Sequence, residues 1–479
     1  MTTLMNLIKK QTSRVYTENY DTSFDTTLNA NLDFFASCGS LRNNQKEVER
    51  KMCFAMNEDF NLSILNMIHL RDVRSGLGER DSFRTAYKVL AKHNPEVAIK
   101  LLPVVVEYGR FDDVLVLLEE RETRKEVVAF LSAKLEEDLD AMKKGDNVSL
   151  CAKWMPSINT SSEKTKRKAK IIIKELGISE KEYRLLLSVL RSYIDIIEKR
   201  LSAKDYTFDY SKIPSKALMR YTEAFRRNDK ERYEAFKEKV TKGEIKTKTS
   251  VVYPHEIINL QDKELMEAMW SDLNRKKGEA KTIVVRDGSG SMTWNGFGGA
   301  RPLDIATSLS ILFSEQLTGE FENKFITFSS KPKLVDLSSC VTLEEKIDEC
   351  NRYTEVANTN IMAVYKLILE AEKKCEPKDY IERIVIISDM QFDKCADDVP
   401  TYETAKEMFE EAGIPLPEIV FWNVASRADF PTQDLKHIKL VSGSSQYIIQ
   451  NIIDSKEIDA ISFMHETLKK YEHILEIIK

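Results

Sequence analysis

The sequence predicts an all-α N-terminal region followed by an α/β domain with a doubly wound, mostly parallel sheet. Two observations support this prediction. Up to about residue 275, apolar side chains recur every three or four residues, which is the spacing of one helix face. From residue 282 on, short β-branched runs alternate with helical segments, as in βαβ units. The length of 479 residues leaves room for two to four domains.

The N-terminal helices are expected to be short and closely connected. Residues such as Gly109 and Pro156 separate them, and Ser82, Asp112 and Ser179 stand where helix N-caps are expected. The segments with helical spacing are 59–73, 82–93, 95–109, 111–122, 123–144, 166–177 and 179–201. Short helices joined by short loops, without strands, are typical of a helical solenoid. No repeat of strict period is present, so any repeats are degenerate.

Six strands are expected in the C-terminal part, with helices between most of them. The strands are 282–285, 324–328, 333–337, 383–388, 418–424 and 437–441, and the helices are 303–317, 360–374 and 402–413. Only the second and third strands are close enough to form a hairpin. The strand sequences lack polar alternation, which is typical of a sheet covered on both faces.

The last segment carries a single apolar stripe at helical spacing. Its members are Ile461, Met464, Leu468, Tyr471, Leu475 and Ile478. Because the stripe is short for a coiled coil, we expect it to pack back on the helical region or on the sheet. The predicted parts are therefore a helical domain at 1–278, an α/β domain at 279–455 and a C-terminal helix at 456–479.

Composition favours a cytoplasmic protein without a membrane partner. No run of 18 or more apolar residues exists, and residues 1–14 lack the apolar core of a secretory signal. The seven cysteines are scattered without a CxxC pair, which favours reduced thiols. The six histidines form no cluster with cysteine and no HExxH motif, so zinc is not expected.

The strongest functional signal stands at the exit of the first predicted strand. In TIVVRDGSGSMTW, residues 282–294, Asp287, Ser289 and Ser291 alternate, and the intervening glycines free the backbone so that the three side chains can point one way. In doubly wound folds, ligands bind at the carboxyl ends of the strands. A carboxylate and two hydroxyls are hard oxygen ligands, which suit Mg²⁺ or Mn²⁺.

Two further oxygen ligands are expected from other loops at the same edge. Asp389 directly follows the fourth strand, in RIVIISDM, and Thr359 stands in a turn just before a helix, in VANTNIMAVY. One or two carboxylates leave a divalent ion under-neutralised, so an open coordination position would attract an acidic group or a phosphate. The opposing interpretation is that Asp287 and the serines only cap the turn and helix that follow.

The pattern D-x-S-x-S, then Thr, then Asp, resembles the metal-ion-dependent adhesion site of von Willebrand factor A domains, over roughly residues 280–455. Asp287, Ser289 and Ser291 match its first motif, Thr359 its threonine and Asp389 its second aspartate. Every motif position is filled. The one departure is Gly288, where many relatives have a larger residue. The resemblance implies a magnesium-dependent ligand-binding domain with a Rossmann-like fold.

The N-terminal phrases HLRDVRSGLGERDSFRTAY (69–87), VVEYGRFDDVLVLL (105–118), LCAKWMPSINTSS (150–162) and DYSKIPSKALMRYTEAFRRND (209–229), with SDMQFD (388–393), resemble an uncharacterised family in which a helical region precedes a von Willebrand A domain. The architecture is also similar to that of the Ro autoantigen (TROVE) proteins. That second resemblance implies HEAT-like helical repeats and binding of small non-coding RNA.

Basic residues give RNA binding independent but limited support. Residues 1–280 carry 50 Lys and Arg against 44 Asp and Glu, a net charge of +6, whereas residues 281–479 carry 22 against 33, a net charge of −11. The candidate RNA contacts are Lys164, Lys166, Arg167, Lys168, Lys170, Arg226 and Arg227. A solvated helix face explains the same residues equally well. Leu218, Tyr221 and Phe225 lie at helical spacing, so their side chains are expected in the core. The arginines of residues 71–84 are expected to form an inter-helix salt-bridge network with nearby acidic residues.

Three functions remain open at this point. The first is a non-enzymatic, Ro-like RNA-binding scaffold with a metal-dependent recognition domain. The second is a protein-binding scaffold whose metal takes a partner's Asp or Glu, without RNA. The third, a metal-dependent phosphohydrolase, is disfavoured because only Asp287 and Asp389 are available, no histidine lies near either motif, and no GxSxG, GxGxxG or Walker motif exists. We therefore expect no catalytic residues.

Overall fold

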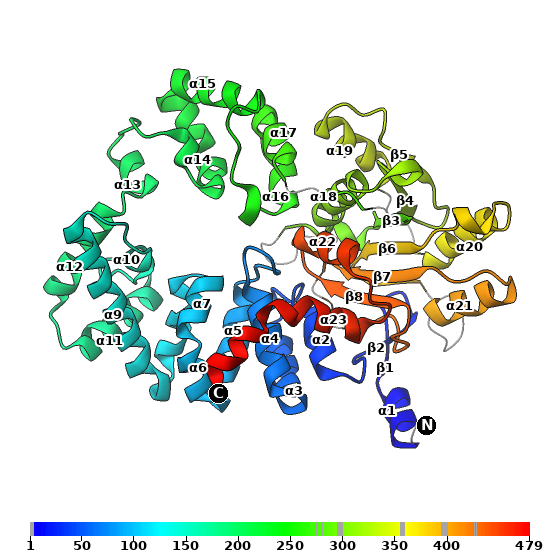
Figure 1. Ribbon diagram of the computed structural model, residues 1–479, viewed down its shortest axis with the longest axis horizontal. Coiled ribbons are helices and arrows are strands. Elements are labelled where there is room, and N and C mark those ends of the chain that lie inside the picture. The colour runs from blue at the N-terminus through cyan, green and yellow to red at the C-terminus, as the bar shows by residue number, and fades with distance from the viewer. Residues whose placement is uncertain are drawn as a thin grey trace.

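The computed structural model describes residues 4–273, 276–278, 281–294, 300–354, 360–393, 401–425, 427 and 429–479. As predicted, a helical N-terminal region is followed by an α/β domain with a mixed sheet. The helices follow an arc, and both ends of the arc lie beside the α/β domain (Figure 1). Helix α2 contacts strand β8 at one end, and α16 and α17 contact α18 and α19 at the other.

The helical arc is built from short helices, with one long exception, α9. Its elements are α1 (Leu4–Thr12), α2 (Ala30–Ser37), α3 (Gln45–Glu58), α4 (Phe60–Arg71), α5 (Asp81–His93), α6 (Pro95–Lys100), α7 (Leu102–Tyr108), α8 (Phe111–Val114), the 3-10 helix η1 (Leu115–Glu119), α9 (Arg121–Lys144), α10 (Cys151–Trp154), α11 (Glu163–Leu176), α12 (Glu180–Tyr193), α13 (Ile197–Ser202), α14 (Ser215–Asn228), α15 (Lys230–Thr241), α16 (Pro254–Ile258) and α17 (Lys263–Ser271).

Local capping explains several of these boundaries. Ser179 caps α12, and its hydroxyl and the Glu182 carboxylate satisfy each other's backbone N–H in a capping box, as expected for this position. The N-caps expected at Ser82 and Asp112 are wrong by two residues each, because the cap residues are Arg80 and Arg110. Helix α5 already begins at Asp81, and α8 begins at Phe111 with the Asp113 carboxylate accepting the N–H of Arg110, 2.9 Å away.

The sheet has the predicted six strands. They are β3 (Thr282–Asp287), β4 (Lys324–Phe328), β5 (Leu334–Asp336), β6 (Arg383–Ser388), β7 (Glu418–Asn423) and β8 (Ile438–Ser442), in the spatial order β5-β4-β3-β6-β7-β8. All neighbours are parallel except β4 and β5, which form the expected hairpin. The strand order therefore reverses between β3 and β6, and the carboxyl ends of these two strands open a crevice at the reversal.

Helices cover the sheet, so β3 and β8 are buried along their whole length, and β6 and β7 are buried after their first residues, Arg383 and Glu418. Helix α18 (Pro302–Glu315) contacts β3, β4 and β6, and α20 (Ile361–Glu372) contacts β4 and α21 (Thr401–Glu411). Two further helices, α19 (Leu343–Arg352) and α22 (Tyr447–Asp454), did not stand out from the sequence. The latter starts in the serine-rich loop that follows β8.

The prediction that residues before 275 contain no strand is wrong at the N-terminus. Strands β1 (Arg14–Tyr16) and β2 (Thr22–Phe24) form a small antiparallel hairpin that lies on the α/β domain. The backbones of Phe24 and Phe430 exchange hydrogen bonds of 2.9 and 2.7 Å, and the Thr17 hydroxyl donates to Phe392 O at 2.8 Å. Three-residue strands have too few side chains for a periodicity, and partners about 400 residues away stabilise them.

The C-terminal segment lies across the helical region (Figure 1). Helix α23 (Ala460–Leu468) contacts α2, α4 and β8, and the 3-10 helix η8 (Lys469–Ile474) and α24 (Leu475–Ile478) continue onto α4 and α6. Tyr471 is buried, and its hydroxyl donates to Asp72 Oδ2 at 2.8 Å and lies 3.4 Å from His69 Nδ1. This one side chain therefore connects the end of the chain to the first helices of the arc.

We expect Tyr471→Phe to loosen the C-terminal segment, because the buried Asp72 carboxylate loses a hydrogen-bond donor, at a cost of about 1–3 kcal/mol. Hydrogen–deuterium exchange of amides in 460–478 should become faster. The matched control is Tyr193→Phe, whose hydroxyl bonds Asp146 O at a half-exposed position. Equal exchange in both variants and the unmodified protein would contradict the anchoring role.

Candidate metal centre and nucleic-acid interface

Strand β3 delivers Asp287 to the crevice at its carboxyl end. The carboxylate is fully buried, and its two oxygens accept hydrogen bonds from Ser289 N at 2.9 Å and Ser388 Oγ at 2.6 Å. The chain then turns through Gly288, where an added Cβ would lie 2.8 Å from Tyr353 O. Only glycine fits this close approach, which explains the departure at the second position of the motif.

Strand β6 delivers Asp389 to the same place. Its carboxylate is buried, accepts Gln391 N at 3.2 Å and receives a hydrogen bond from the Ser291 side chain. The N-terminal hairpin holds this loop, because Glu18 N donates to Gln391 Oε1 at 2.7 Å and the Asn19 amide donates to Gln391 O at 3.0 Å. The hairpin that the sequence did not reveal therefore supports the predicted site.

The described members of the predicted metal set lie together. The hydroxyl oxygens of Ser289 and Ser291 are 3.1 Å apart. Two neighbouring oxygens in an octahedral magnesium site are about 3.0 Å apart, since Mg–O distances are about 2.0–2.1 Å. The spacing and the hard oxygen donors thus fit a small divalent cation, which Ser289, Ser291 and Asp389 could hold with Asp287 beneath them. Thr359 lies outside the described residues.

A cation would also resolve an electrostatic conflict. Burial, and then the charge of Asp389, raise the pKa of Asp287 to about 7, and burial raises the pKa of Asp389. Among the described residues no three His, Cys, Asp or Glu side chains gather into a metal-binding group. The described part of the site therefore combines two hydroxyls, of Ser289 and Ser291, with the two carboxylates of Asp287 and Asp389, and a bound divalent ion would keep coordination positions for a ligand from outside.

The metal residues open into a cavity of about 600 Å³, the edge cavity. Ser291 and Asp389 form one wall, and Ser40 and Arg42 of the loop between α2 and α3 contribute to the other. Arg427 also lines it and pairs with Glu18 of the N-terminal hairpin, with 2.6 Å between Nη2 and Oε1. The open side of the candidate ion thus faces the helical region of the same chain.

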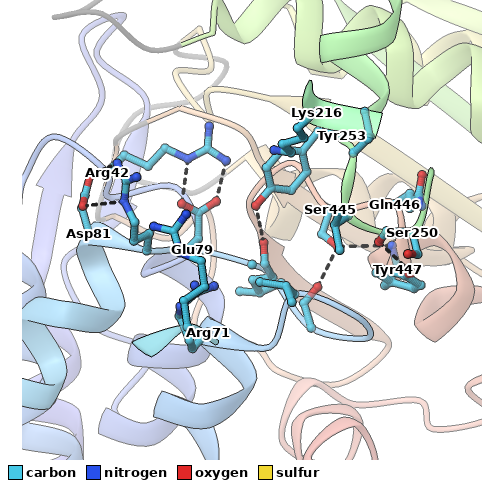
Figure 2. A pocket seen from close by; sticks show the side chains of 18 of the residues that line it. Arg42, Arg71, Glu79, Asp81, Lys216, Ser250, Tyr253, Ser445, Gln446 and Tyr447 are labelled. Carbon is cyan, nitrogen blue, oxygen red and sulfur yellow. Dashed lines mark hydrogen bonds and ion pairs between the residues drawn. The ribbon is translucent and has the colours of Figure 1, made fainter. Parts of the chain in front are cut away.

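A second cavity of about 590 Å³, the junction cavity, lies where the helical arc meets the α/β domain (Figure 2). Arg42 makes a bidentate ion pair with Glu79 and donates to Ser444 Oγ at 2.5 Å, so it joins loops from both parts of the chain. The Tyr253 hydroxyl donates to Leu77 O at 3.0 Å, and Ser445 Oγ donates to Gly76 O at 2.7 Å. These bonds close the arc.

A third cavity of about 870 Å³, the basic cleft, lies within the helical arc. Its basic lining residues are Arg42, Arg84, Lys88, Lys153, Lys164, Lys168 and Arg191, whereas Asp81 and Asp112 are its acidic ones. Both acids are already paired: Asp81 pairs with Arg80, and Asp112 pairs with Arg84 and Arg110. In the part of the chain that the structure describes, neither Lys164 nor Lys168 forms an ion pair. Arg42, Arg84 and Lys88 have carboxylate partners, so the excess positive charge of the cleft lies chiefly at Lys153, Lys164 and Lys168.

Lys168 is a partly buried lysine of this cleft with a shifted pKa. Its pKa is lowered to about 8, chiefly because burial disfavours the charged form; the charge of Glu119 opposes this, and Lys164, Lys88 and Arg84 add smaller lowering contributions. A bound anion beside Lys168 would favour its charged form. Trp154 lines the same cleft, and the Arg110 guanidinium stands 4.1 Å above its ring centre. The ring therefore both packs and forms part of the cleft wall.

The structure separates the predicted RNA-contacting residues into groups. Only Lys164 and Lys168 line the cleft. Lys166 pairs with Glu163 at 2.8 Å, and Arg226 pairs with the buried Asp262 at 3.0 Å. Arg167, Lys170 and Arg227 are exposed and line none of the three cavities. Arg42 and Lys153 have no motif around them, and their place in the cleft comes from tertiary structure alone.

Two other predictions about the helical region can be compared with the structure. Leu218 and Phe225 are buried in the core as predicted, whereas Tyr221 is only partly buried and packs against the core. Phe225 contacts the buried rings of Tyr210 and Tyr233. The arginines do form an inter-helix network, but its central acids come from the FDD segment. Arg71 and Arg84 both bind Asp113, each with 2.7 Å between Nε and a carboxylate oxygen.

Comparisons with known proteins divide the chain at the start of β3. A family model described as a domain of unknown function, DUF2828, matches residues 120–287, and another, DUF7788, matches residues 281–475. Uncharacterized protein L728 of Acanthamoeba polyphaga mimivirus is 26% identical over 514 residues, which is 95% of this chain and 87% of that protein. These descriptions agree with the predicted resemblance to uncharacterised families and name no function.

Two solved structures are similar over different shares of the chain. The Deinococcus radiodurans RO (RSR) protein matches with a TM-score of 0.46 and 14% identity, over 89% of this chain and 92% of that one. Proximal thread matrix protein 1 from the mussel byssus matches with a TM-score of 0.25 and 14% identity, over 37% and 47%. Within the described ranges, no helix is both long and apolar enough to cross a bilayer.

The metal set leads to a direct prediction about stability. Mg²⁺ should raise the melting temperature, because an ion that binds only the folded chain at a hundredfold excess over its dissociation constant contributes about 2.7 kcal/mol. Asp287→Asn should abolish this rise, which thermal unfolding with Mg²⁺ or EDTA measures. Asp336→Asn, on the exposed edge strand β5, is the matched control and should retain the full shift. An unchanged shift in the Asp287 variant would contradict the site.

Proposed function

We propose that the protein is a non-enzymatic scaffold that binds single-stranded RNA in the basic cleft and carries Mg²⁺ or Mn²⁺ at the carboxyl edge of its sheet. The observation that carries the proposal is the unneutralised positive charge of the cleft around Lys164 and Lys168. Phosphates supply matching negative charge without any sequence requirement. The resemblance to the Ro (TROVE) proteins, with HEAT-like repeats before a von Willebrand A domain, supports RNA as the partner.

The geometry of the cleft suits a strand more than a globular partner. Its lysines come from three helices, with Lys88 on α5, Lys153 on α10 and Lys164 on α11, so several elements around the cleft contribute the charge. Trp154 offers an aromatic surface within the same cleft, where a base can stack. A charged groove with an aromatic wall is the usual arrangement of proteins that bind single strands without strong sequence preference.

Catalysis is not part of the proposal. Phosphoryl chemistry with two metals needs several bridging carboxylates, and the edge cavity offers Asp389 with Asp287 buried beneath it. No histidine is among the described residues that line the edge cavity or the basic cleft. Hydroxyl-rich coordination favours holding an anion over activating water. A protein scaffold without RNA, with the ion taking a partner's carboxylate, is the competing proposal.

Neutralising the cleft should weaken RNA binding in a salt-dependent way. We expect the double variant Lys164→Gln/Lys168→Gln to reduce the slope of log affinity against log salt by about 1.4, since each lost phosphate contact to a single strand removes about 0.7. Fluorescence anisotropy with a short labelled RNA measures the slope. The matched control is Arg167→Gln/Lys170→Gln, which removes two exposed charges from the same helix, α11, away from the cleft. Equal slopes in both variants would refute the assignment.

RNA affinity should also fall as the pH rises from about 7 to about 9. Lys168 has its pKa lowered to about 8 in the free cleft, facing Lys164, Lys88 and Arg84 as well as Glu119. A bound phosphate favours the charged form, so binding takes up a proton only above this pKa. Lys168→Arg stays protonated throughout and should remove the dependence. An adenosine oligonucleotide avoids base titration in this range, and a pH effect that persists in the variant would exclude Lys168 as its source.

A further inference from the structure

We propose that the strand bound in the basic cleft continues through the junction cavity to the edge cavity, where one of its phosphates takes the open coordination position of the cation. This inference rests on the proposed function and extends it. It assigns to the metal a nucleic-acid phosphate in place of the protein carboxylate that the family resemblance implies.

The three cavities meet at one side chain. Arg42 lines all of them, Asn43 is shared by the junction and edge cavities, and Asp81 is shared by the junction cavity and the basic cleft. Arg42 is held in place from both sides, by Glu79 of the helical arc and by Ser444 of the α/β domain. Arg42 and Asp81 lie at the junction cavity in Figure 2, so a strand that leaves the basic cleft past Arg42 would enter this cavity and then the neighbouring edge cavity.

The loop that faces the metal residues is fixed close to the sheet. Gly39 N donates a hydrogen bond to Ser442 Oγ at 3.1 Å. A Cβ at position 39 would lie 2.5 Å from Ser442 O, so no larger residue fits at this close approach. The edge cavity of about 600 Å³ lies within the range of about 300–1,000 Å³ that is usual for small-molecule sites. It therefore admits a slender strand more readily than the surface loop of a folded partner.

The charges around the edge cavity suit a phosphate. Arg42 and Arg427 both line it, and each already has one carboxylate partner, Glu79 and Glu18. A guanidinium has five N–H donors, more than one carboxylate can accept. The two non-bridging oxygens of a phosphodiester can serve a cation and a guanidinium at once, and arginine matches this geometry well. A divalent ion held by Ser289, Ser291 and Asp389 would offer an open coordination position to one of these oxygens.

The first test varies the length of the RNA. Uridine oligonucleotides that fill only the basic cleft should bind equally well in Mg²⁺ and in EDTA. Beyond a threshold length, Mg²⁺ should increase affinity by about tenfold, the effect expected of one added charge-assisted contact. Asp287→Asn and the milder Ser291→Ala, at an exposed position, should both remove the increase while short oligonucleotides bind unchanged. The Asp336→Asn control should retain it.

The second test identifies the ligand atom. A phosphorothioate at the responsible position should lower affinity in Mg²⁺, which prefers oxygen, and Mn²⁺, which accepts softer ligands, should restore it. The phosphate assignment would be overturned, and the proposed function left intact, if RNA of every length bound equally well in Mg²⁺ and in EDTA and if neither variant changed the affinity. Metal-dependent capture of a glutamate-containing peptide under those conditions would assign the ion to a protein ligand. Absence of RNA binding at low salt would refute both proposals.

Discussion

The parallel pairing of β3 with β6 is the constraint on which the rest of the structure depends. The pairing sets Arg286 opposite Ile387, so the two strands end side by side and release Asp287 and Asp389 into one crevice. Both strands are buried, which fixes their positions but also forces two carboxylates into a region from which water is largely excluded. Hydrogen bonds from Ser388, Ser289 and Ser291 offset part of that cost. Asp287 nevertheless remains buried beside a like charge, and a divalent cation is the partner that would complete the site.

The second constraint is that the helical arc is attached to the α/β domain at both ends. At one end the N-terminal hairpin and α2 lie against β8 and the loop after β6. At the other, α16 and α17 meet α18 and α19, with Trp270 Nε1 donating to the buried Glu315 at 3.0 Å. An arc held in this way keeps its inner surface at a set distance from the sheet edge. The basic cleft and the metal residues can therefore act on one ligand, which a flexible tether between two domains would not allow.

Ion pairs have two different roles in this arrangement. Arg71 and Asp113 are buried, and the partly exposed Arg84 joins them, so the three side chains connect α4, α5 and α8 and their charges are used within the fold. Lys164 and Lys168 have similar chemistry but lack such partners, and their charges remain available to solvent or ligand. Sequence composition treats these groups alike, since both are Lys/Arg-rich stretches near acids. The difference between a structural cation and a binding cation is decided by which carboxylate lies within reach in three dimensions.

The sequence by itself determined the positions of the six strands of the large sheet, many of the helices, and the place of Asp287, Ser289 and Ser291 after β3. These strand positions, the β4–β5 hairpin, the buried Phe225 and the alternation of Asp287, Ser289 and Ser291 rest on short-range patterns, which can be recognised in a linear sequence. The local sequence pattern predicted helix boundaries less well, since Ser82 and Asp112 are not the N-caps. It did not predict the N-terminal hairpin. Only tertiary structure decided that Arg42 stands between three cavities, that Lys168 but not Arg167 faces the cleft, and that the metal residues face the helical arc. These properties depend on contacts between residues up to about 400 positions apart, and no local pattern carries information about the distance between such residues once the chain has folded.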